Sequence, residues 1–290
     1  MNTIWSKYVQ GTKTLYYSRK LRFDDLFSEQ YRNLFGLDAK QQLKILEIGC
    51  GPGALAGALH RWYPLAEITA VDRDSEFVRF GTENEPGVNF VEGDATALPF
   101  EDNTFDVTIS NTVAEHIEPS KFYGEQLRVL KPGGICLVLS SRKGININPS
   151  CITFNKYEQQ FWKKAEQHDD SMDRFAVCKY PMNEAEMPVV MSEYGFSNVS
   201  TGFAAIDLTP DNPKFSAPLA LDMINANRYT ALDGIDSVLH TMPEHFTTGE
   251  VEEMKRLANA KYDTRIEQYQ RGEKQWDTNV SIIMVIRGTK

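Results

Sequence analysis

The feature that most constrains this chain is a glycine-rich turn that directly follows a short apolar segment. Residues 44–49 read as a β-strand, and Gly51 and Gly53 follow before a helical pattern begins at Ala54. Glycine lets the backbone turn tightly and approach a ligand with no Cβ in the way, while the start of a helix offers free N–H groups. A strand, a glycine turn and a helix in this order predict a loop that binds a nucleotide-like molecule.

The pattern alternates between short β-rich runs and helical stretches from this turn to about residue 145. Such alternation is typical of a parallel sheet whose strands are joined by crossover helices. We therefore predict an α/β fold. The expected strands are 44–49, 67–72, 88–92, 105–110, 135–140, a segment within 199–208, and 281–287, and the expected helices between the first five are 54–62, 75–81 and 121–130.

Outside the alternating part the pattern is less regular. We expect an N-terminal arm or lid over 1–41 and a core over 42–290. Two insertions in that core, at about 146–182 and 209–278, are expected to form a substrate-covering subdomain. The first insertion contains an amphipathic helical segment, and the second ends in a long helix that begins at a Thr247–Glu250 capping box.

Composition narrows the class of protein. The 290 residues are 41% hydrophobic and carry a formal charge of −9, so the chain is globular and would repel a nucleic acid. No apolar run approaches the ~20 residues that cross a bilayer, and residues 1–22 do not resemble a signal peptide. The four cysteines form no CxxC pair, which favours free thiols over a disulfide or zinc framework. We expect a cytoplasmic protein without a metal site, a nucleic-acid partner or integral membrane association; its oligomeric state stays open.

The glycine turn alone leaves two ligand classes open. Gly49, Gly51 and Ala54 also satisfy the dinucleotide fingerprint G-x-G-x-x-G/A, and Asp72 follows at a suitable distance to bind ribose hydroxyls. An NAD(P)-dependent oxidoreductase is therefore one alternative. Asp94, just beyond the third strand, provides a carboxylate that can accept a hydrogen bond from an adenine amino group.

Further motifs follow in a fixed order along the chain. They are Leu98-Pro99-Phe100, residues 103–106, Ala114-Glu115-His116-Ile117 and Leu130-Lys131-Pro132-Gly133-Gly134. With the glycine turn and Asp94, this set resembles the class I S-adenosylmethionine-dependent methyltransferases, in particular the small-molecule branch called type 11. The resemblance covers about residues 42–140. It implies a Rossmann-like methyltransferase fold with a doubly wound, mostly parallel seven-stranded sheet and helical insertions forming a lid.

The resemblance also implies S-adenosyl-L-methionine as cofactor and S-adenosyl-L-homocysteine as product. The glycines would shape the loop under the methionine part, Asp72 would bind the ribose, and Asp94 would contact the adenine edge. The implied cofactor-binding residues are Glu47, Gly49, Cys50, Gly51, Gly53, Asp72, Arg73, Asp94, Ala95, Asn111 and Thr112. Cys50 has two interpretations, a reactive thiol beside a helix N-terminus or a small filler.

Methyl transfer from a sulfonium to a small-molecule acceptor is an in-line displacement, so proximity and exclusion of water can supply most of the catalysis. His116 and Glu115 follow the fourth strand and are the candidate catalytic residues. His116 would either take a proton from the acceptor or position it. The acceptor atom stays open between oxygen, nitrogen and carbon, and a non-catalytic S-adenosylmethionine-binding scaffold is the second alternative.

The candidate substrate residues come from the arm and the first insertion. The arm carries seven basic and four acidic residues with interleaved aromatics. One hypothesis is that it folds over the site, with rings covering the sulfonium or acceptor and an arginine meeting a carboxylate or phosphate. The alternatives are a docked helix with solvated charges and, for the insertion, ordinary packing. The candidates are Tyr16, Tyr17, Arg19, Arg22, Tyr157, Glu158 and Phe161.

Overall fold

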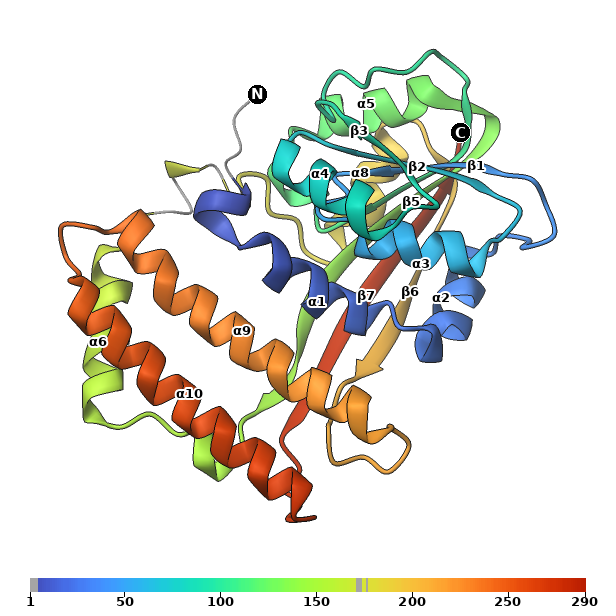
Figure 1. Cartoon of the computed structure of the whole chain (residues 1–290). Helices are drawn as coiled ribbons and strands as arrows, with labels where there is room; N and C mark the ends of the chain where they lie inside the picture. The colour runs from blue at the N-terminus through green and yellow to red at the C-terminus, as the bar shows by residue number, and fades with distance from the viewer. Residues whose placement is uncertain (1–4, 171–173, 176) are drawn as a thin grey trace.

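The core of the protein is a seven-stranded sheet of order β3-β2-β1-β4-β5-β7-β6, seen in a computed structural model that describes residues 5–170, 174–175 and 177–290. Neighbouring strands from β3 to β5 pair in parallel, and β7 lies antiparallel between β5 and β6. The expected mostly parallel sheet is confirmed (Figure 1). The strands are β1 (Lys44–Ile48), β2 (Glu67–Asp72), β3 (Asn89–Glu92), β4 (Phe105–Asn111), β5 (Leu130–Ile147), β6 (Ser197–Asp207) and β7 (Thr278–Thr289).

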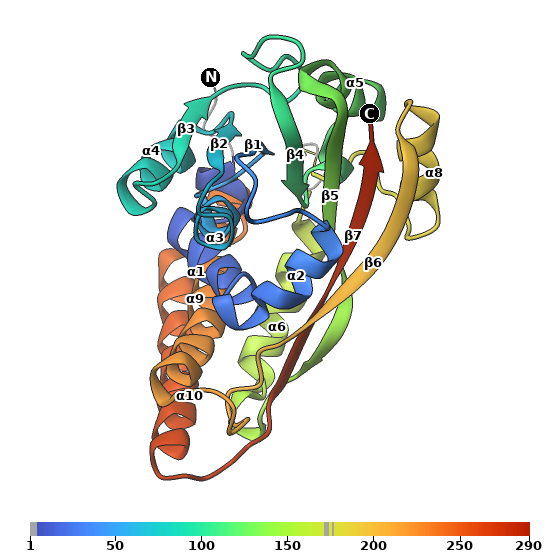
Figure 2. The ribbon, with the colours of Figure 1, turned by 90° about the vertical axis from the view of Figure 1, so that its right-hand side faces the viewer.

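Helices cover both faces of this sheet, as the doubly wound prediction requires (Figure 2). Successive residues of β5 point to opposite faces: Leu137 joins the buried cluster that includes α3, and Val138 joins the cluster that includes α5 and α8. The helices around the sheet are α1 (Thr12–Arg22), α2 (Ser28–Phe35), α3 (Ala54–Trp62), α4 (Ser75–Asn84), α5 (Pro119–Val129) and α8 (Glu186–Glu193), with short turns η1 (Trp5–Val9), η2 (Asp25–Phe27), η3 (Ala114–His116) and η4 (Ser150–Ile152).

Local signals explain where several helices begin. α3 starts directly after Gly53, whose φ of 90° makes it the left-handed N-cap residue. α5 starts with Pro119 at its first position, where the missing N–H costs nothing. α5 ends at Val129, and the Lys131-Pro132-Gly133-Gly134 stop then lies within β5.

Three strands are longer than expected and carry a separate helical lobe. β5 continues to Ile147 rather than ending near residue 140, and it pairs with β7 as far as Ile147↔Thr278. The lobe consists of α6 (Lys156–His168), α9 (Ala217–Thr241) and α10 (Thr248–Gln270). The block after residue 209, expected to be irregular before its last helix, is therefore largely two long helices, and the Thr247–Glu250 capping box of the second is confirmed.

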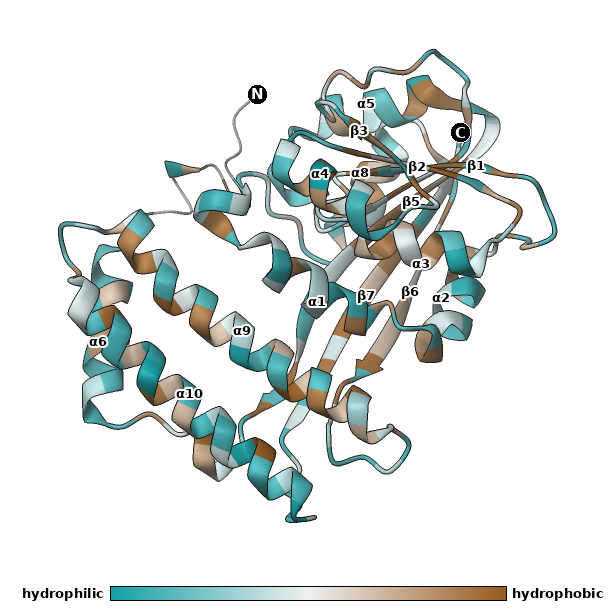
Figure 3. Ribbon diagram, viewed as in Figure 1, coloured by the Kyte–Doolittle hydropathy of each residue, from teal (hydrophilic) through white to brown (hydrophobic). Residues whose placement is uncertain are grey.

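The lobe has a small core of its own. Phe161 of α6 packs with Val238 of α9 and Met254 of α10 in one buried cluster. Figure 3 shows the apolar stretches concentrated in the strands, whereas α9 and α10 alternate between apolar and polar residues along their length. Such alternation is typical of helices with one buried face.

A buried ion cluster fixes the lobe to the sheet. Arg265 of α10 is fully buried, and its Nη2 donates to Asp211 Oδ2 at 2.9 Å and to Asp277 Oδ1 at 2.6 Å. Asp277 immediately precedes β7, so the cluster ties the end of α10 to the sheet. Within the described ranges, no helix is both long and apolar enough to span a membrane.

Candidate active site

The main candidate site is a cavity of about 370 Å³ at the carboxyl edge of the parallel strands. Ligands bind at this edge in open α/β sheets, and the volume lies in the usual range for small-molecule sites. The structure brings many of the expected residues together here: Arg19, Gly49, Gly51, Asp72, Arg73, Asp94, Ala95, Asn111, Thr112 and His116 all line it.

The glycine turn has the geometry for which glycine is needed. Gly49, Gly51 and Gly53 have φ of 66°, 54° and 90°. A Cβ on Gly49 would lie 2.5 Å from Val113 Cγ2, and one on Gly53 would lie 2.5 Å from Phe90 Cζ. The turn therefore excludes larger residues on conformational and steric grounds, and its backbone borders the cavity.

Asp72 is held in one orientation at the end of β2. Its Oδ2 accepts the Gly51 N–H at 2.8 Å, and its Oδ1 accepts the Asp74 N–H at 2.9 Å. Burial raises the pKa of this carboxyl, while the two N–H groups lower it. Each carboxylate oxygen keeps a lone pair, so Asp72 can still accept hydrogen bonds from a vicinal pair of hydroxyls.

Asp94 and Ala95 follow β3, the strand next to β2, and line the same cavity. Asp94 Oδ1 accepts from the backbone N–H and from the hydroxyl of Thr96, both at 2.8 Å. These bonds fix the carboxylate, and its Oδ2 has no bonded partner among the described residues. This oxygen is placed to accept from a ligand amino group beside the Ala95 backbone.

Arg19 of α1 closes the cavity beside the end of β4. Its Nη2 donates to Thr112 Oγ1 at 2.7 Å and its Nη1 to the Asn111 carbonyl at 3.4 Å. Burial and the neighbouring Arg22 lower the pKa of Arg19 to about 10, so it stays charged at neutral pH. The guanidinium retains unused N–H donors for an anionic group.

Glu47, near the end of β1, lies next to this cation but does not line the cavity. The side chain is 1% exposed, and its Oε2 has no hydrogen-bond partner among the described residues. Burial raises the pKa of Glu47 to about 8, although the charge of Arg19 partly opposes that rise. The carboxyl is therefore mostly neutral at pH 7.

His116 lines the cavity from η3 and is already engaged by protein groups. Its Nδ1 accepts the Cys178 N–H at 2.8 Å, and its ring meets Trp5 edge-on at a centroid distance of 4.8 Å. Burial and the charges of Arg19 and Arg73 lower the pKa of His116 to about 4. The bond to Nδ1 assigns the neutral ring proton to Nε2, so His116 presents a hydrogen-bond donor rather than a base.

Glu115 lies outside the cavity lining. Its backbone carbonyl accepts the Tyr180 N–H at 2.9 Å, so it helps to hold the segment around residue 180. Burial raises the pKa of its carboxyl, and its Oε2 is buried without a partner among the described residues. The structure thus places Glu115 behind the cavity wall.

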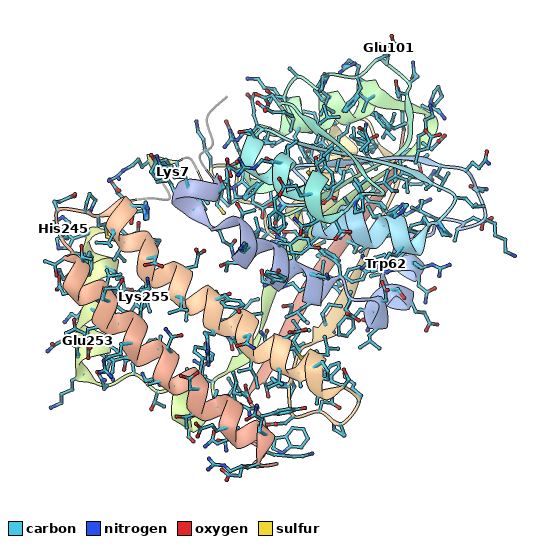
Figure 4. The ribbon with its side chains drawn as sticks, viewed as in Figure 1. Lys7, Trp62, Glu101, His245, Glu253 and Lys255 are labelled. Atoms are coloured by element: carbon cyan, nitrogen blue, oxygen red, sulfur yellow. The ribbon has the colours of Figure 1, made fainter. Side chains whose placement is uncertain are left out.

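The arm and the segment around residue 180 cover the cavity together. Figure 4 shows Lys7 of η1 between the lobe, marked by His245, and the sheet. Ser6 donates from N and Oγ to Asp74 at 2.9 and 3.1 Å, and the Gly11 N–H donates to Asp233 of α9 at 2.9 Å. The arm is therefore bound to both the core and the lobe.

Several residues that line this cavity carry no local sequence signal for that position. Trp5 and Leu15 come from the arm, whose aromatic and basic pattern indicated a covering role but not which side chains face inward. Phe175, Lys179 and Tyr180 come from a stretch without helix or strand periodicity, so no local signal marked them. Long-range contacts alone bring them to the site.

Several other predicted residues lie away from the cavity. Tyr16 is buried and donates to Glu85 Oε1 at 2.6 Å, whereas Tyr17 is 45% exposed. Arg22 and Gly53 do not line the cavity either. Cys50 is buried, and burial raises the pKa of its thiol well above the usual value, which corrects the reactive-thiol interpretation in favour of a filler.

The three candidates from the first insertion have structural partners in the lobe instead. Phe161 packs in the lobe core, and Tyr157 is 39% exposed. Glu158 is buried, completes the capping box of α6 with Asn155 and pairs with Lys261 of α10. None of the three is among the residues that line the cavity. Within the described part of the chain, no group of three or more His, Cys, Asp or Glu residues is arranged to hold a metal ion.

Comparison with known proteins agrees with this geometry. Residues 46–138 match the family model described as "Methyltransferase domain". The chain is 40% identical over 103 residues to phthiotriol/phenolphthiotriol dimycocerosates methyltransferase 1 of Mycobacterium ulcerans, covering 34% of this chain and 38% of that protein. It is 38% identical over 108 residues to a fatty-acid O-methyltransferase of Mycolicibacterium smegmatis, covering 36% and 39%. The matched stretch thus spans well under half of either relative.

The fold is also found among solved structures. Phosphoethanolamine N-methyltransferase 2 of Haemonchus contortus, in complex with S-adenosyl-L-methionine, aligns with a TM-score of 0.52 and 17% sequence identity. The alignment covers 99% of this chain and 59% of that one. At this identity the likeness shows the shared Rossmann-like fold.

Proposed function

We propose that the protein methylates a small molecule with S-adenosyl-L-methionine, since residues 46–138 match the methyltransferase domain model and the relatives that match this stretch are methyltransferases. S-adenosyl-L-homocysteine would be the second product. The relatives that match this stretch share only part of their length with the chain, so the activity of the whole protein rests on the site itself.

The main support for this proposal is that one cavity is bordered by protein groups suited to each part of the cofactor. Asp72 is oriented by two backbone N–H groups at 2.8 and 2.9 Å, as binding of two ribose hydroxyls requires. Asp94 and Ala95 stand where an adenine edge can be bound, and the glycine turn leaves room for the backbone to approach the ligand. Arg19 lies at the end of β4, where the amino-acid part of the cofactor would end.

The charges near that end suit an amino-acid group. Arg19 offers unused N–H donors to a carboxylate, next to the Asn111 carbonyl, which already accepts from Arg19 Nη1 and from Thr112 Oγ1. We propose that Arg19 binds the carboxylate of the cofactor rather than an acceptor anion. Glu47 would stay behind the loop and support it, since it does not line the cavity.

The chain's own contribution to the reaction would be positioning. Bound S-adenosylmethionine supplies a methyl carbon on a positively charged sulfur, which takes the bonding electrons when the acceptor's bond to the methyl forms. Trp5, Leu15 and Tyr180 line the cavity and would exclude water once the ligands are bound, and such exclusion with alignment can supply most of the rate. His116 would donate its Nε2–H to the acceptor or to the cofactor and would not remove a proton.

We also propose a small-molecule acceptor and a cytoplasmic location for the protein. The net charge of −9 disfavours a nucleic-acid acceptor, and the four described cysteines are unpaired, as in a reducing cytoplasm. The arm and the segment around residue 180 would form the lid over the acceptor. Methyltransferase relatives also support this function over an oxidoreductase or a scaffold.

The proposal predicts transfer of a labelled methyl group. Purified protein would be incubated with methyl-labelled S-adenosylmethionine and a metabolite extract, and products would be identified by mass spectrometry. A labelled small molecule formed together with an equal amount of S-adenosylhomocysteine supports the proposal. Tight cofactor binding without any labelled product would favour the scaffold alternative.

A further inference from the structure

A second cavity lies between the helical lobe and the arm, and the site described above does not use it. Its volume is about 620 Å³, against about 370 Å³ for the cavity at the sheet edge. Its walls come from α6, α9 and η1 and include Tyr8, Trp162, Gly234, Val238 and Met242. Figure 1 shows η1 beside the end of α9, consistent with the contacts between these two elements.

Most of the described side chains that line this second cavity are apolar, and its two charged ones, Glu166 and Asp169, are both acidic. The first cavity, in contrast, is lined by Arg19, Arg73, Lys121 and Lys179. An anionic group is therefore favoured in the first cavity and disfavoured in the second, whose apolar side chains can pack against the uncharged part of a ligand. Burial of apolar surface would provide the affinity there.

One polar group in the second cavity lacks a partner. The Trp162 indole N–H is buried and has no hydrogen bond within the described residues. Buried donors are normally satisfied, so an unmatched one at a cavity wall is a place where a bound molecule can contribute an acceptor atom. The cavity thus fits a largely apolar molecule that carries a hydrogen-bond acceptor, such as an oxygen atom, for the Trp162 indole N–H.

The same two segments border both cavities. In η1, Trp5 lines the first cavity and Tyr8 lines the second. In the other segment, Phe175 lines the first cavity and Val177 the second. The rings of Tyr8 and Phe175 stack at a centroid distance of 5.2 Å, so a residue that lines the second cavity contacts one that lines the first.

We propose that the second cavity binds the apolar part of the methyl acceptor, whose reactive atom then lies beyond the Tyr8–Phe175 pair in the first cavity. The acceptor is accordingly an amphipathic molecule with a hydrocarbon chain or ring system. This inference rests on the proposed methyltransferase function and adds the class of substrate to it. It also gives the lobe a role as an acceptor-binding element.

The variant that tests this proposal fills the second cavity from α9. A Cβ on Gly234 would meet Trp162 at 3.7 Å, which is ordinary contact, so Gly234→Leu can project into the space without a backbone clash. Gly249→Leu on α10 is the matched control, because a Cβ there has no neighbour within 4 Å. Both changes add the same side chain to a helix of the lobe.

The probes are dodecanoate and butanoate, titrated calorimetrically into protein saturated with S-adenosylhomocysteine. We expect affinity to rise about fourfold per added methylene until the cavity is filled, so dodecanoate should bind far more tightly than butanoate. Gly234→Leu should weaken dodecanoate at least about tenfold and leave butanoate and S-adenosylhomocysteine unchanged. Gly249→Leu should change none of the three.

Two results would overturn the inference while leaving the proposed function intact. One is normal S-adenosylhomocysteine binding without any preference for the longer chain. The other is equal dodecanoate affinity in Gly234→Leu and the unaltered protein. Failure of S-adenosylhomocysteine to bind at all would instead overturn the proposed function, and this inference with it.

Discussion

The Nδ1 atom of His116 accepts the backbone N–H of Cys178 at 2.8 Å, and this contact decides what the histidine can do. It joins η3, at the edge of the sheet, to the segment that carries Lys179 and Tyr180 over the cavity. A ring nitrogen that accepts from an amide is not free to take a proton from an acceptor. The structure therefore favours a positioning role for His116.

The first prediction concerns His116→Asn, which keeps an acceptor near the position of Nδ1. Loss of a general base typically lowers kcat by about 10²–10⁴-fold. We expect kcat of the variant to fall by less than about tenfold, because the amide oxygen can still hold Cys178. Steady-state kinetics with an identified acceptor will check this, and His116→Ala, which cannot hold Cys178, should raise KM more than His116→Asn does. A hundredfold loss of kcat in His116→Asn would instead show that His116 acts as a general base.

The second prediction concerns Arg19 and the amino-acid end of the cofactor, as distinct from its adenosine end. Arg19 lies by the Asn111 carbonyl, away from Asp94, so Arg19→Gln should weaken S-adenosylhomocysteine at least about tenfold, the loss of one charge-assisted bond. Adenosine lacks the carboxylate and should bind the variant as it binds the unaltered protein. Calorimetric titration of both ligands measures this, with the exposed Lys13→Gln on the same helix as control. If Arg19→Gln weakened adenosine binding as much as S-adenosylhomocysteine binding, Arg19 would not be bound to the carboxylate of the cofactor.

The third prediction is a pH dependence of stability caused by Glu47. Its pKa in the folded protein is about 8, against 4.5 ordinarily, so between these values the folded state binds more protons than the unfolded state. The free energy of unfolding then falls as pH rises through this window. The stability that accompanies the neutral Glu47 carboxyl is fully present only below about pH 4.5.

Glu47→Gln removes this titration. Its stability relative to the unaltered protein should increase by about 1.4 kcal/mol per pH unit across the window. Urea unfolding at pH 5, 6, 7 and 8 measures the difference, with the exposed Glu83→Gln as control. A stability difference that does not change with pH would contradict the buried, neutral state of Glu47.

The fourth prediction compares two glycines of the same turn. Both Gly49 and Gly51 have positive φ, which costs an alanine about 1–2 kcal/mol. A Cβ on Gly51 would lie 3.4 Å from Leu15, whereas one on Gly49 would lie 2.5 Å from Val113. Gly49→Ala should therefore destabilise the protein more than Gly51→Ala, as measured by urea unfolding. The reverse order would show that the turn adopts another conformation.

The cofactor half of the site could be predicted because its signals are local. The turn at Gly49, Asp72 and Asp94 each follow a strand, and the carboxyl ends of parallel strands meet at one edge. α3 was expected at the residues where it lies, 54–62, because a glycine turn precedes it and apolar residues recur at helical spacing.

The acceptor half could not be predicted in the same way. α9, which forms a wall of the second cavity, was missed because Asp222, Asn227 and Gly234 interrupt its apolar pattern. Its N-cap Ser216 and the proline at Pro218 were a usable start signal. Phe175 and Tyr180 reach the first cavity only through contacts with η1 and η3, which no local periodicity encodes.

Whether the cavity is a site for S-adenosylmethionine can be decided by calorimetric titration of S-adenosylhomocysteine and NAD into the unaltered protein and into Asp72→Ala, with the exposed Asp38→Ala as control. We expect one S-adenosylhomocysteine per chain and no NAD binding. In Asp72→Ala the affinity for S-adenosylhomocysteine should fall at least about a hundredfold, because two hydrogen bonds to a charged group disappear. NAD binding without S-adenosylhomocysteine binding, or unchanged affinity in Asp72→Ala, would contradict the assignment of this cavity to S-adenosylmethionine.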